Sequence, residues 1–158
     1  MPDQRIIKGK STIDTARIGV VASRFNSFIV DRLQSACLQQ LKIAGVSGEN
    51  IIVVQVPGAF EIPQAAARLI KTQHCDAVIT LGAIIRGETP HFEYIARECA
   101  HGIGRVALKY DTPVIFGVLT VDNADQAMDR AGGEESNKGA EAAQAAIEMV
   151  SVMREMEL

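Results

Sequence analysis

The stretch that decides the fold is AVITLGAIIRGETPHFEY, residues 77–94. It begins with a short apolar run, Ala77–Leu81, which is typical of a buried strand, and it ends in the first turn of a helix. Thr89 is of a type that caps helices, and proline fits the first helical position because its missing N–H would be unpaired there. We therefore predict a helix that begins at Pro90. The unpaired N–H groups and positive dipole of that turn would attract an anion.

His91 lies inside this turn and is the candidate catalytic residue, since histidine can accept and return a proton near neutral pH. Gly87, Glu88 and Thr89 precede the helix, and their N–H groups and the Thr89 hydroxyl suit a phosphate or carboxylate. The charge of Glu88 opposes such an anion unless its side chain points away. Taken alone, these residues fit a solvated histidine beside a helix cap equally well.

Three further pairs of a β-rich run and a helical stretch surround this segment, as expected for βα units that build a parallel sheet. The strand runs are continuously apolar, which indicates burial on both faces. We predict an α/β fold: a three-layer α/β/α sandwich of the flavodoxin-like type with a four-stranded parallel sheet. The predicted strands are 17–22, 51–56, 77–81 and 114–119, and the predicted helices are 27–44, 62–72, one from Pro90 onward, 123–131 and 137–156. Ile6 and Ile7 would add an edge strand, either to this sheet or to that of a neighbouring subunit.

Length and composition suit one domain over residues 1–158, because 47% of the 158 residues are hydrophobic and can form a core. The formal net charge of -3 is spread along the chain without a basic block, so nucleic acid is not an expected partner. The start has no signal-like apolar core, and no apolar run approaches the roughly 18 residues that span a bilayer. We expect a cytoplasmic protein without membrane contact.

Cysteine and histidine spacing gives no metal site. Cys37, Cys75 and Cys99 are predicted as small core residues rather than as a disulfide framework or zinc ligands. The stretch Gly102–Ala107 formally matches the dinucleotide fingerprint, but it lies late in a helical stretch rather than at a strand-to-helix turn. Close packing or a helix end explains these glycines better than nicotinamide binding.

Four segments are expected to meet beyond the carboxyl ends of the strands, where open parallel sheets bind their ligands. Phe25 follows the first strand and would form either a satellite core or a flat wall for an aromatic ring. Glu61 follows the second strand and would either accept hydrogen bonds from ligand hydroxyls or complement a helix start. The 82–91 segment follows the third strand, and Phe116 belongs to the fourth.

Two cations, Arg130 and Lys138, flank a glycine-rich turn. Either would supply a partner for the same anion, or would remain a solvated surface charge. Arg86 is a third cation, and we expect it to pair with a neighbouring carboxylate instead. Asp122 is expected on an exposed helix face, not in a metal site.

Six motifs, in order along almost the whole chain, resemble those of the lumazine synthase family, the penultimate enzymes of riboflavin synthesis. Each motif is weak alone, but six at compatible spacing make a chance match improbable. The resemblance implies condensation of 5-amino-6-(D-ribitylamino)uracil with 3,4-dihydroxy-2-butanone 4-phosphate to 6,7-dimethyl-8-ribityllumazine, with release of phosphate and water and without a cofactor. The motifs are Arg24-Phe25-Asn26, residues 56–63, 82–94 and 113–120, Arg130-Ala131-Gly132 and Asn137-Lys138-Gly139.

The resemblance also implies a role for each candidate residue. His91 matches the proton-transfer residue of the family. The pyrimidine and its ribityl chain would be held by Phe25, Ala59, Phe60, Glu61, Ala83, Ile84, Ile85 and Phe116. The phosphate would be held by Glu88, Thr89, Arg130 and Lys138.

An oligomer is implied as well: a homopentamer, or a multiple of pentamers, with active sites between subunits. Phe116 and Arg130 would come from the neighbour of the subunit that supplies His91. Association with a riboflavin synthase is a further expectation of the family. Many members carry Thr-Lys-Ala-Gly, or something close, where this chain has Gly133-Glu134-Glu135-Ser136. In the family this turn helps to decide whether pentamers form a hollow icosahedral shell, so the resemblance leaves a pentamer, a decamer and an icosahedral shell of 60 subunits open.

Two other classes of protein remain open. A non-catalytic flavodoxin-like module that binds a flavin or a phosphorylated ligand would use Phe25 and the anion site in the same way. A structural shell protein would use the alanine-rich last helix. His91 together with Arg130 favours the enzyme, because simple binding needs no proton acceptor beside the site of a leaving group.

Overall fold

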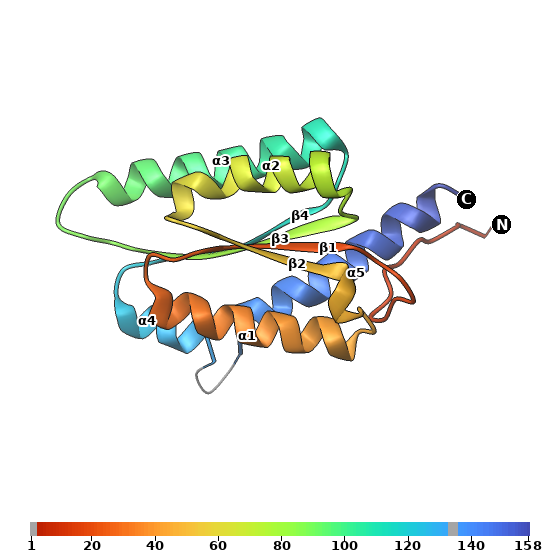
Figure 1. The fold of residues 1–158 in the computed structure, drawn as a ribbon, viewed down its shortest axis with the longest axis horizontal. Helices are drawn as coiled ribbons and strands as arrows, with labels where there is room; N and C mark the ends of the chain where they lie inside the picture. Colours follow the sequence, from red (N-terminus) through yellow and green to blue (C-terminus); the bar gives the residue numbers. More distant parts are fainter. Residues whose placement is uncertain (1–2, 133–135) are drawn as a thin grey trace.

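The computed structural model describes residues 3–132 and 136–158, and a parallel sheet of four strands lies at its centre (Figure 1). The strand order is β2-β1-β3-β4. β1 (Ile18–Ser23) and β3 (Ala77–Ile85) are central, whereas β2 (Ile51–Val56) and β4 (Val114–Val121) are at the edges. The central position of β1 and β3 explains why almost every residue of both strands is buried and most are apolar.

Helices cover both faces of this sheet (Figure 1). On one face lie α1 (Ser27–Ile43), α4 (Ala124–Arg130) and α5 (Lys138–Met156), and on the other lie α2 (Ile62–Gln73) and α3 (His91–Tyr110). Short 3-10 turns, η1 (Gly48–Asn50) and η2 (Ala59–Glu61), precede β2 and α2. The predicted three-layer α/β/α sandwich of the flavodoxin-like type is confirmed.

Side chains of the central strands alternate between two cores, as the two-residue period of a strand requires. From β3, Ile79 and Leu81 join the core beneath α1 and α5, while Val78 joins the core beneath α2 and α3. The three cysteines are buried in these cores as predicted. Burial raises the pKa of the Cys37 thiol to about 12 and that of Cys99 to about 11, so both stay protonated in the folded chain.

Glycines allow close approach of helices at two places. A Cβ at Gly139 would collide with the backbone carbonyl of Leu33, so α5 packs directly on α1 there. A Cβ at Gly102 would lie 2.7 Å from Pro63 Cγ, so α3 approaches α2 closely at that point. Gly102 and Gly104 lie inside α3, where a dinucleotide-binding turn cannot form.

All the predicted strands and helices of the sandwich exist, but some ends differ. β3 ends at Ile85 rather than Leu81, and β4 ends at Val121 rather than Leu119. The two strands continue because they pair with each other to the last residue, Ile85 opposite Val121. The apolar residues 82–85 therefore belong to the strand and not to the turn that follows it.

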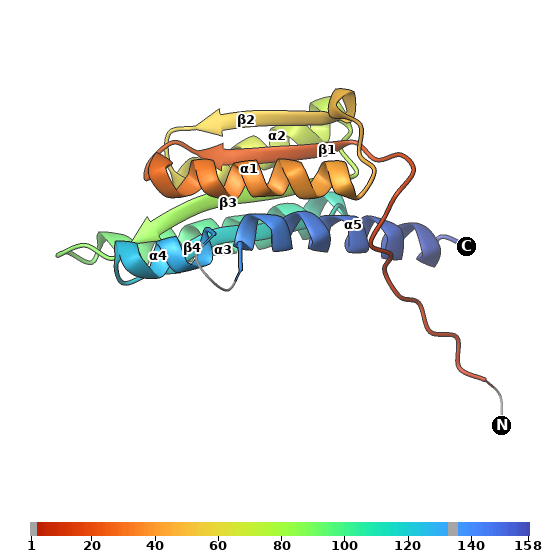
Figure 2. The ribbon, with the colours of Figure 1, turned by 90° about the horizontal axis from the view of Figure 1, so that it is seen from below.

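The N-terminal segment differs from the prediction. Residues 3–17 form no strand on this sheet, and Figure 2 shows them leaving it past the end of α5. The Lys10 N–H donates to Ser151 Oγ at 2.7 Å, which ties the segment to α5. The expectation of an edge strand on the chain's own sheet is wrong, because these backbone groups run beside a helix instead. Within the described residues, no helix is long and apolar enough to cross a membrane.

Candidate functional site

A pocket of about 260 Å³ opens beyond the carboxyl ends of β1 and β3. The loop after β1, the turn η2, the end of β3 and the first turn of α3 surround it, because parallel strands end at one edge of the sheet. Its wall brings together seven of the predicted site residues: Phe25, Ala59, Ala83, Ile84, Ile85, Thr89 and His91. The Phe25 side chain is 71% exposed, so it is a pocket wall and not a satellite core.

The end of β3 presents open backbone to this pocket. β1 pairs with β3 only as far as Leu81, whereas β4 pairs with β3 to Ile85. The side of residues 83–85 that faces away from β4 therefore has no strand beside it and lines the pocket. Asn26 Nδ2 donates to the Ala83 carbonyl there at 2.7 Å. Because backbone groups alternate along a strand, the N–H and C=O of Ile85 point to this same open side.

Three predicted residues lie next to the pocket wall rather than on it. Phe60 and Glu61 are exposed in η2, directly after Ala59, and Phe60 is 58% exposed. Glu88 is exposed between Gly87 and Thr89, which both line the pocket. All three are exposed and adjacent in the chain to residues that line the pocket.

A second depression, of about 430 Å³, contains the other predicted residues. Phe116, Arg130 and Lys138 line it, together with Thr120 and Glu141. In this structure each cation already has a partner: Arg130 Nη1 donates to the Gln126 carbonyl at 3.0 Å, and Lys138 Nζ lies 2.7 Å from Glu141 Oε2.

The expectation that the four strand-end segments meet at one place is therefore wrong, within one chain, for the segment of Phe116. Phe116 lies opposite Thr80, near the start of the edge strand β4, and not at its carboxyl end. The two cations belong to α4 and α5, which cover the opposite face of the sheet from α3 and His91. One chain thus has two separate groups of predicted site residues.

The start of α3 differs by one residue from the prediction. The helix begins at His91, Pro90 is its N-cap, and no side chain caps it. Thr89 therefore precedes the cap instead of forming it. Pro90 nevertheless has a helical φ of -67°, since its ring fixes that angle, and no side chain accepts from the N–H groups of the first turn.

The sequence was compared with models of known protein families. Residues 15–154 match the family described as 6,7-dimethyl-8-ribityllumazine synthase, which covers nearly the whole chain. The chain belongs to the lumazine synthase family. Lumazine synthases are transferases of riboflavin biosynthesis that act on small molecules and assemble as oligomers.

Gly87, whose N–H was predicted for the anion site, also lines the lumazine synthase pocket, but four other lining residues were not among the predicted site residues: Ser23, Asn26, Phe92 and Ile95. Asn26 has a detectable sequence signal, because asparagine tolerates the left-handed conformation that it adopts here, with φ of 64°. Phe92 and Ile95 resemble ordinary apolar positions of a helix, so no signal separates them from the core.

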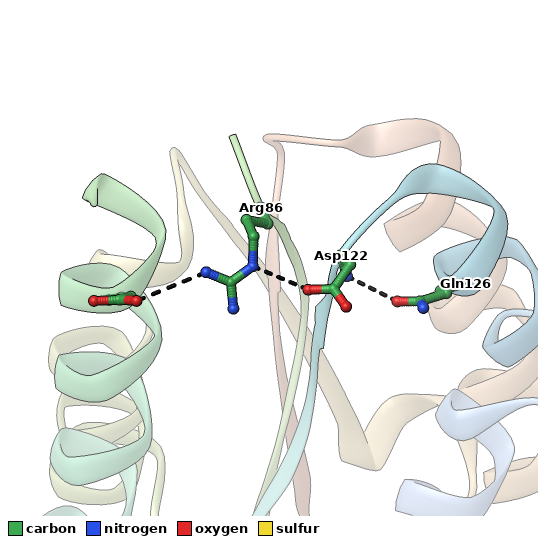
Figure 3. A network of polar contacts seen from close by, with 4 residues as sticks. Arg86, Asp122 and Gln126 are labelled. Carbon is green, nitrogen blue, oxygen red and sulfur yellow. Dashed lines mark hydrogen bonds and ion pairs between the residues drawn. The ribbon is translucent and has the colours of Figure 1, made fainter. Parts of the chain in front are cut away.

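Arg86 pairs with carboxylates, as expected for this cation. Its Nε donates to Asp122 Oδ1 at 2.9 Å, and its Nη1 lies 3.7 Å from Glu93 Oε1 (Figure 3). Asp122 precedes Asn123, the N-cap of α4, and pairs with Arg86, so its predicted place on an exposed helix face is wrong. Within residues 3–132 and 136–158, His, Cys, Asp and Glu side chains form no group of three that would hold a metal ion.

Proposed function

We propose that the chain condenses 5-amino-6-(D-ribitylamino)uracil with 3,4-dihydroxy-2-butanone 4-phosphate to 6,7-dimethyl-8-ribityllumazine, and releases phosphate and water without a cofactor. The observation that carries the proposal is that Phe25, the open backbone of residues 83–85 and His91 all line one and the same pocket. A planar heterocycle with N–H and C=O groups on one edge fits between a flat aromatic wall and a free strand edge.

The pyrimidine binds against β3. The Ile85 N–H and C=O supply one donor and one acceptor at the open side of the strand, and Phe25 stacks on the ring. Ala59, Ala83 and Ile84 complete the apolar wall. The ribityl chain extends to the mouth of the pocket, where Phe60 packs on it and the exposed Glu61 carboxylate accepts hydrogen bonds from its hydroxyls.

The phosphate binds at the first turn of α3. Gly87 and Thr89 line the pocket, and the N–H groups of this loop and turn, with the Thr89 hydroxyl, donate to phosphate oxygens. Glu88 contributes its backbone N–H, and its exposed side chain turns to solvent. This location places the leaving group next to His91.

His91 moves protons during imine formation, phosphate elimination and ring closure. Both substrates are held in one pocket, so most of the acceleration comes from positioning. His91 is exposed on the helix start and is free to exchange its proton with water between steps.

A neighbouring subunit completes the site. Phe116, Arg130 and Lys138 lie in a separate depression of each chain, so they reach substrate only when the edge strand β4 of one subunit lies against the His91 pocket of the next. Arg130 has donors beyond the one bonded to Gln126, and these bind the phosphate together with Lys138. Closing such a head-to-tail contact gives a ring, which we propose is a pentamer.

The experiment that tests the proposal mixes purified protein with both substrates and follows lumazine absorbance and phosphate release in parallel. Equal molar yields of the two products are expected. Binding of both substrates without product would favour a non-catalytic module for flavin or phosphorylated ligands.

Two variants refine this test. His91→Ala should slow turnover without abolishing it, because positioning persists in the variant. His101→Ala is the matched control, since His101 is exposed on the same helix but does not line the pocket. Complete loss of activity in a folded His91→Ala protein would show that proton transfer contributes more than positioning.

A further inference from the structure

The Arg86 side chain connects the two ends of the loop that carries the proposed phosphate contacts. Arg86 directly precedes Gly87, and its backbone N–H donates to the Val121 carbonyl at the end of β4, at 2.9 Å. Its guanidinium carbon lies 4.5 Å from the ring centroid of Phe92, and its Nη1 lies 3.7 Å from Glu93 Oε1. The residue before the loop thus contacts the two residues that follow His91.

Asp122 makes the third contact with the Arg86 guanidinium, after those of Phe92 and Glu93. Arg86 Nε donates to Asp122 Oδ1 at 2.9 Å, and the Asp122 N–H donates to Gln126 Oε1 at 2.8 Å (Figure 3). The Gln126 N–H in turn donates to Asn123 Oδ1 at 2.9 Å, which caps α4. The carboxylate that Arg86 contacts is therefore attached to the junction between β4 and α4, a fixed point of the fold.

The loop itself has few other attachments. Residues 86–90 are exposed, and a Cβ at Gly87 would meet no atom within 4 Å. No side chain caps the start of α3. Phe92 and Ile95 pack α3 against the core, and the contacts of Arg86 with Phe92, Glu93 and Asp122 connect the loop to that packed turn and to the end of β4.

These contacts contribute little to the stability of the whole fold. The Arg86 side chain is 48% exposed, and those of Glu93 and Asp122 are more exposed still. Exposed ion pairs are screened by water and change the free energy of unfolding only slightly. The contacts of Arg86 with Phe92, Glu93 and Asp122 therefore matter more for the position of the neighbouring loop than for the free energy of unfolding.

We infer that Arg86 is a positioning residue that holds loop 87–90 and the first turn of α3, so that the phosphate and His91 are aligned. The inference rests on the proposed function, because it assigns the phosphate to this loop. Arginine is required rather than lysine, since only the planar guanidinium can stack on Phe92 and reach two carboxylates in different directions.

The test compares Arg86→Gln and Arg86→Lys with the matched control Arg154→Gln. Arg154 forms an ion pair with Asp76 at 3.5 Å, and its side chain is 44% exposed, close to the value for Arg86, but it does not line the pocket. Both Arg86 variants should lower kcat/KM for the phosphate substrate by about tenfold or more, because small misplacements of reacting groups are costly. The KM for the pyrimidine and the melting temperature should match those of the Arg154→Gln control.

Asp122→Asn gives a second measure of the same contact. It should lower kcat/KM for the phosphate substrate as well, and the Arg86→Gln/Asp122→Asn double variant should lose less than the product of the two single losses, because both changes remove one interaction. Inorganic phosphate, titrated by calorimetry, should bind more weakly to Arg86→Gln than to Arg154→Gln.

Unchanged constants for the phosphate substrate in Arg86→Gln would overturn the inference. Equal losses for both substrates, together with a lower melting temperature than the control, would also overturn it, since they would indicate a general structural role. Failure of the proposed function has a different signature: neither the unaltered protein nor Arg154→Gln would form lumazine.

Discussion

Asn26 holds the pocket wall through two separable properties, its hydrogen bond and its backbone conformation. Its side chain donates to the Ala83 carbonyl at 2.7 Å, and its φ of 64° lies in the left-handed region. Asn26→Ala removes the bond, worth about 0.5–1.5 kcal/mol, and adds a left-handed strain of about 1–2 kcal/mol. The free energy of unfolding should fall by the sum, about 1.5–3.5 kcal/mol.

Asn26→Gly separates the two contributions, because it removes the same bond but tolerates the conformation. It should be more stable than Asn26→Ala by about 1 kcal/mol, since the flexibility of glycine in the unfolded chain offsets part of the relieved strain. Both variants should raise the KM for the pyrimidine alike, because both release the Ala83 segment of the wall.

Thermal unfolding followed by circular dichroism measures these differences. At this chain length 1 kcal/mol corresponds to about 2–4 °C in melting temperature, so Asn26→Ala should melt about 3–14 °C below the unaltered protein. All proteins must be compared at one concentration, because assembly contributes to stability. Equal melting temperatures of the alanine and glycine variants would refute the argument from the left-handed backbone.

Further predictions concern packing, pH and the second depression. Gly139→Ala should lower the free energy of unfolding by about 1–3 kcal/mol, because the added Cβ meets the backbone of α1. Gly48→Ala should raise it by about 0.4–1 kcal/mol, because its Cβ would have no atom within 4 Å. Urea unfolding of the two variants measures both changes. Burial raises the pKa values of Cys37 and Cys99 above 9.0, so above about pH 9 these thiols ionise in the unfolded chain before they ionise in the folded one. The free energy of unfolding should therefore be retained below pH 9 and fall as the pH rises above it. Unfolding measured from pH 7 to 11 would contradict this if stability stayed level. Arg130→Ala should mainly raise the KM for the phosphate substrate in steady-state assays, and unchanged kinetics for that substrate would remove Arg130 from the site.

The sequence predicts the architecture well because each strand of the sheet carries its own signal. The continuous apolar run Ile18–Ala22 identifies a buried parallel strand, and the pattern of the final helix identifies its buried face, with Ala143, Ile147 and Val150 in the core. The similar run Ile51–Val56 is wrong as a strand buried on both faces, because β2 lies at the edge of the sheet. The end of β3 was harder to predict, since residues 82–85 remain in the strand only through pairing with β4. Pairing over a long sequence distance leaves no local signal.

The sequence predicts which residues line the candidate site, but not that they are divided between two separate depressions of one chain. Thr89 and His91 stand beside a recognisable helix start, and Phe25 follows a recognisable strand. Phe116 lies near the start of an edge strand, and its register opposite Thr80 of β3 shows that it is remote from the carboxyl edge. The departure at Gly133, Glu134 and Glu135 lies outside the described residues, so its predicted effect on assembly stays a prediction.

The central claim is that each active site combines the His91 pocket of one subunit with the Arg130 depression of the next. Mixed oligomers of His91→Ala and Arg130→Ala subunits test it directly, because neither variant alone has an intact site. Random mixing in equal amounts restores both intact halves at about one quarter of the contacts between subunits. The account predicts that lumazine formation by the mixed oligomers, at a low concentration of the phosphate substrate, rises well above the mean of the two parent proteins. Activity that stays at that mean would contradict a shared site.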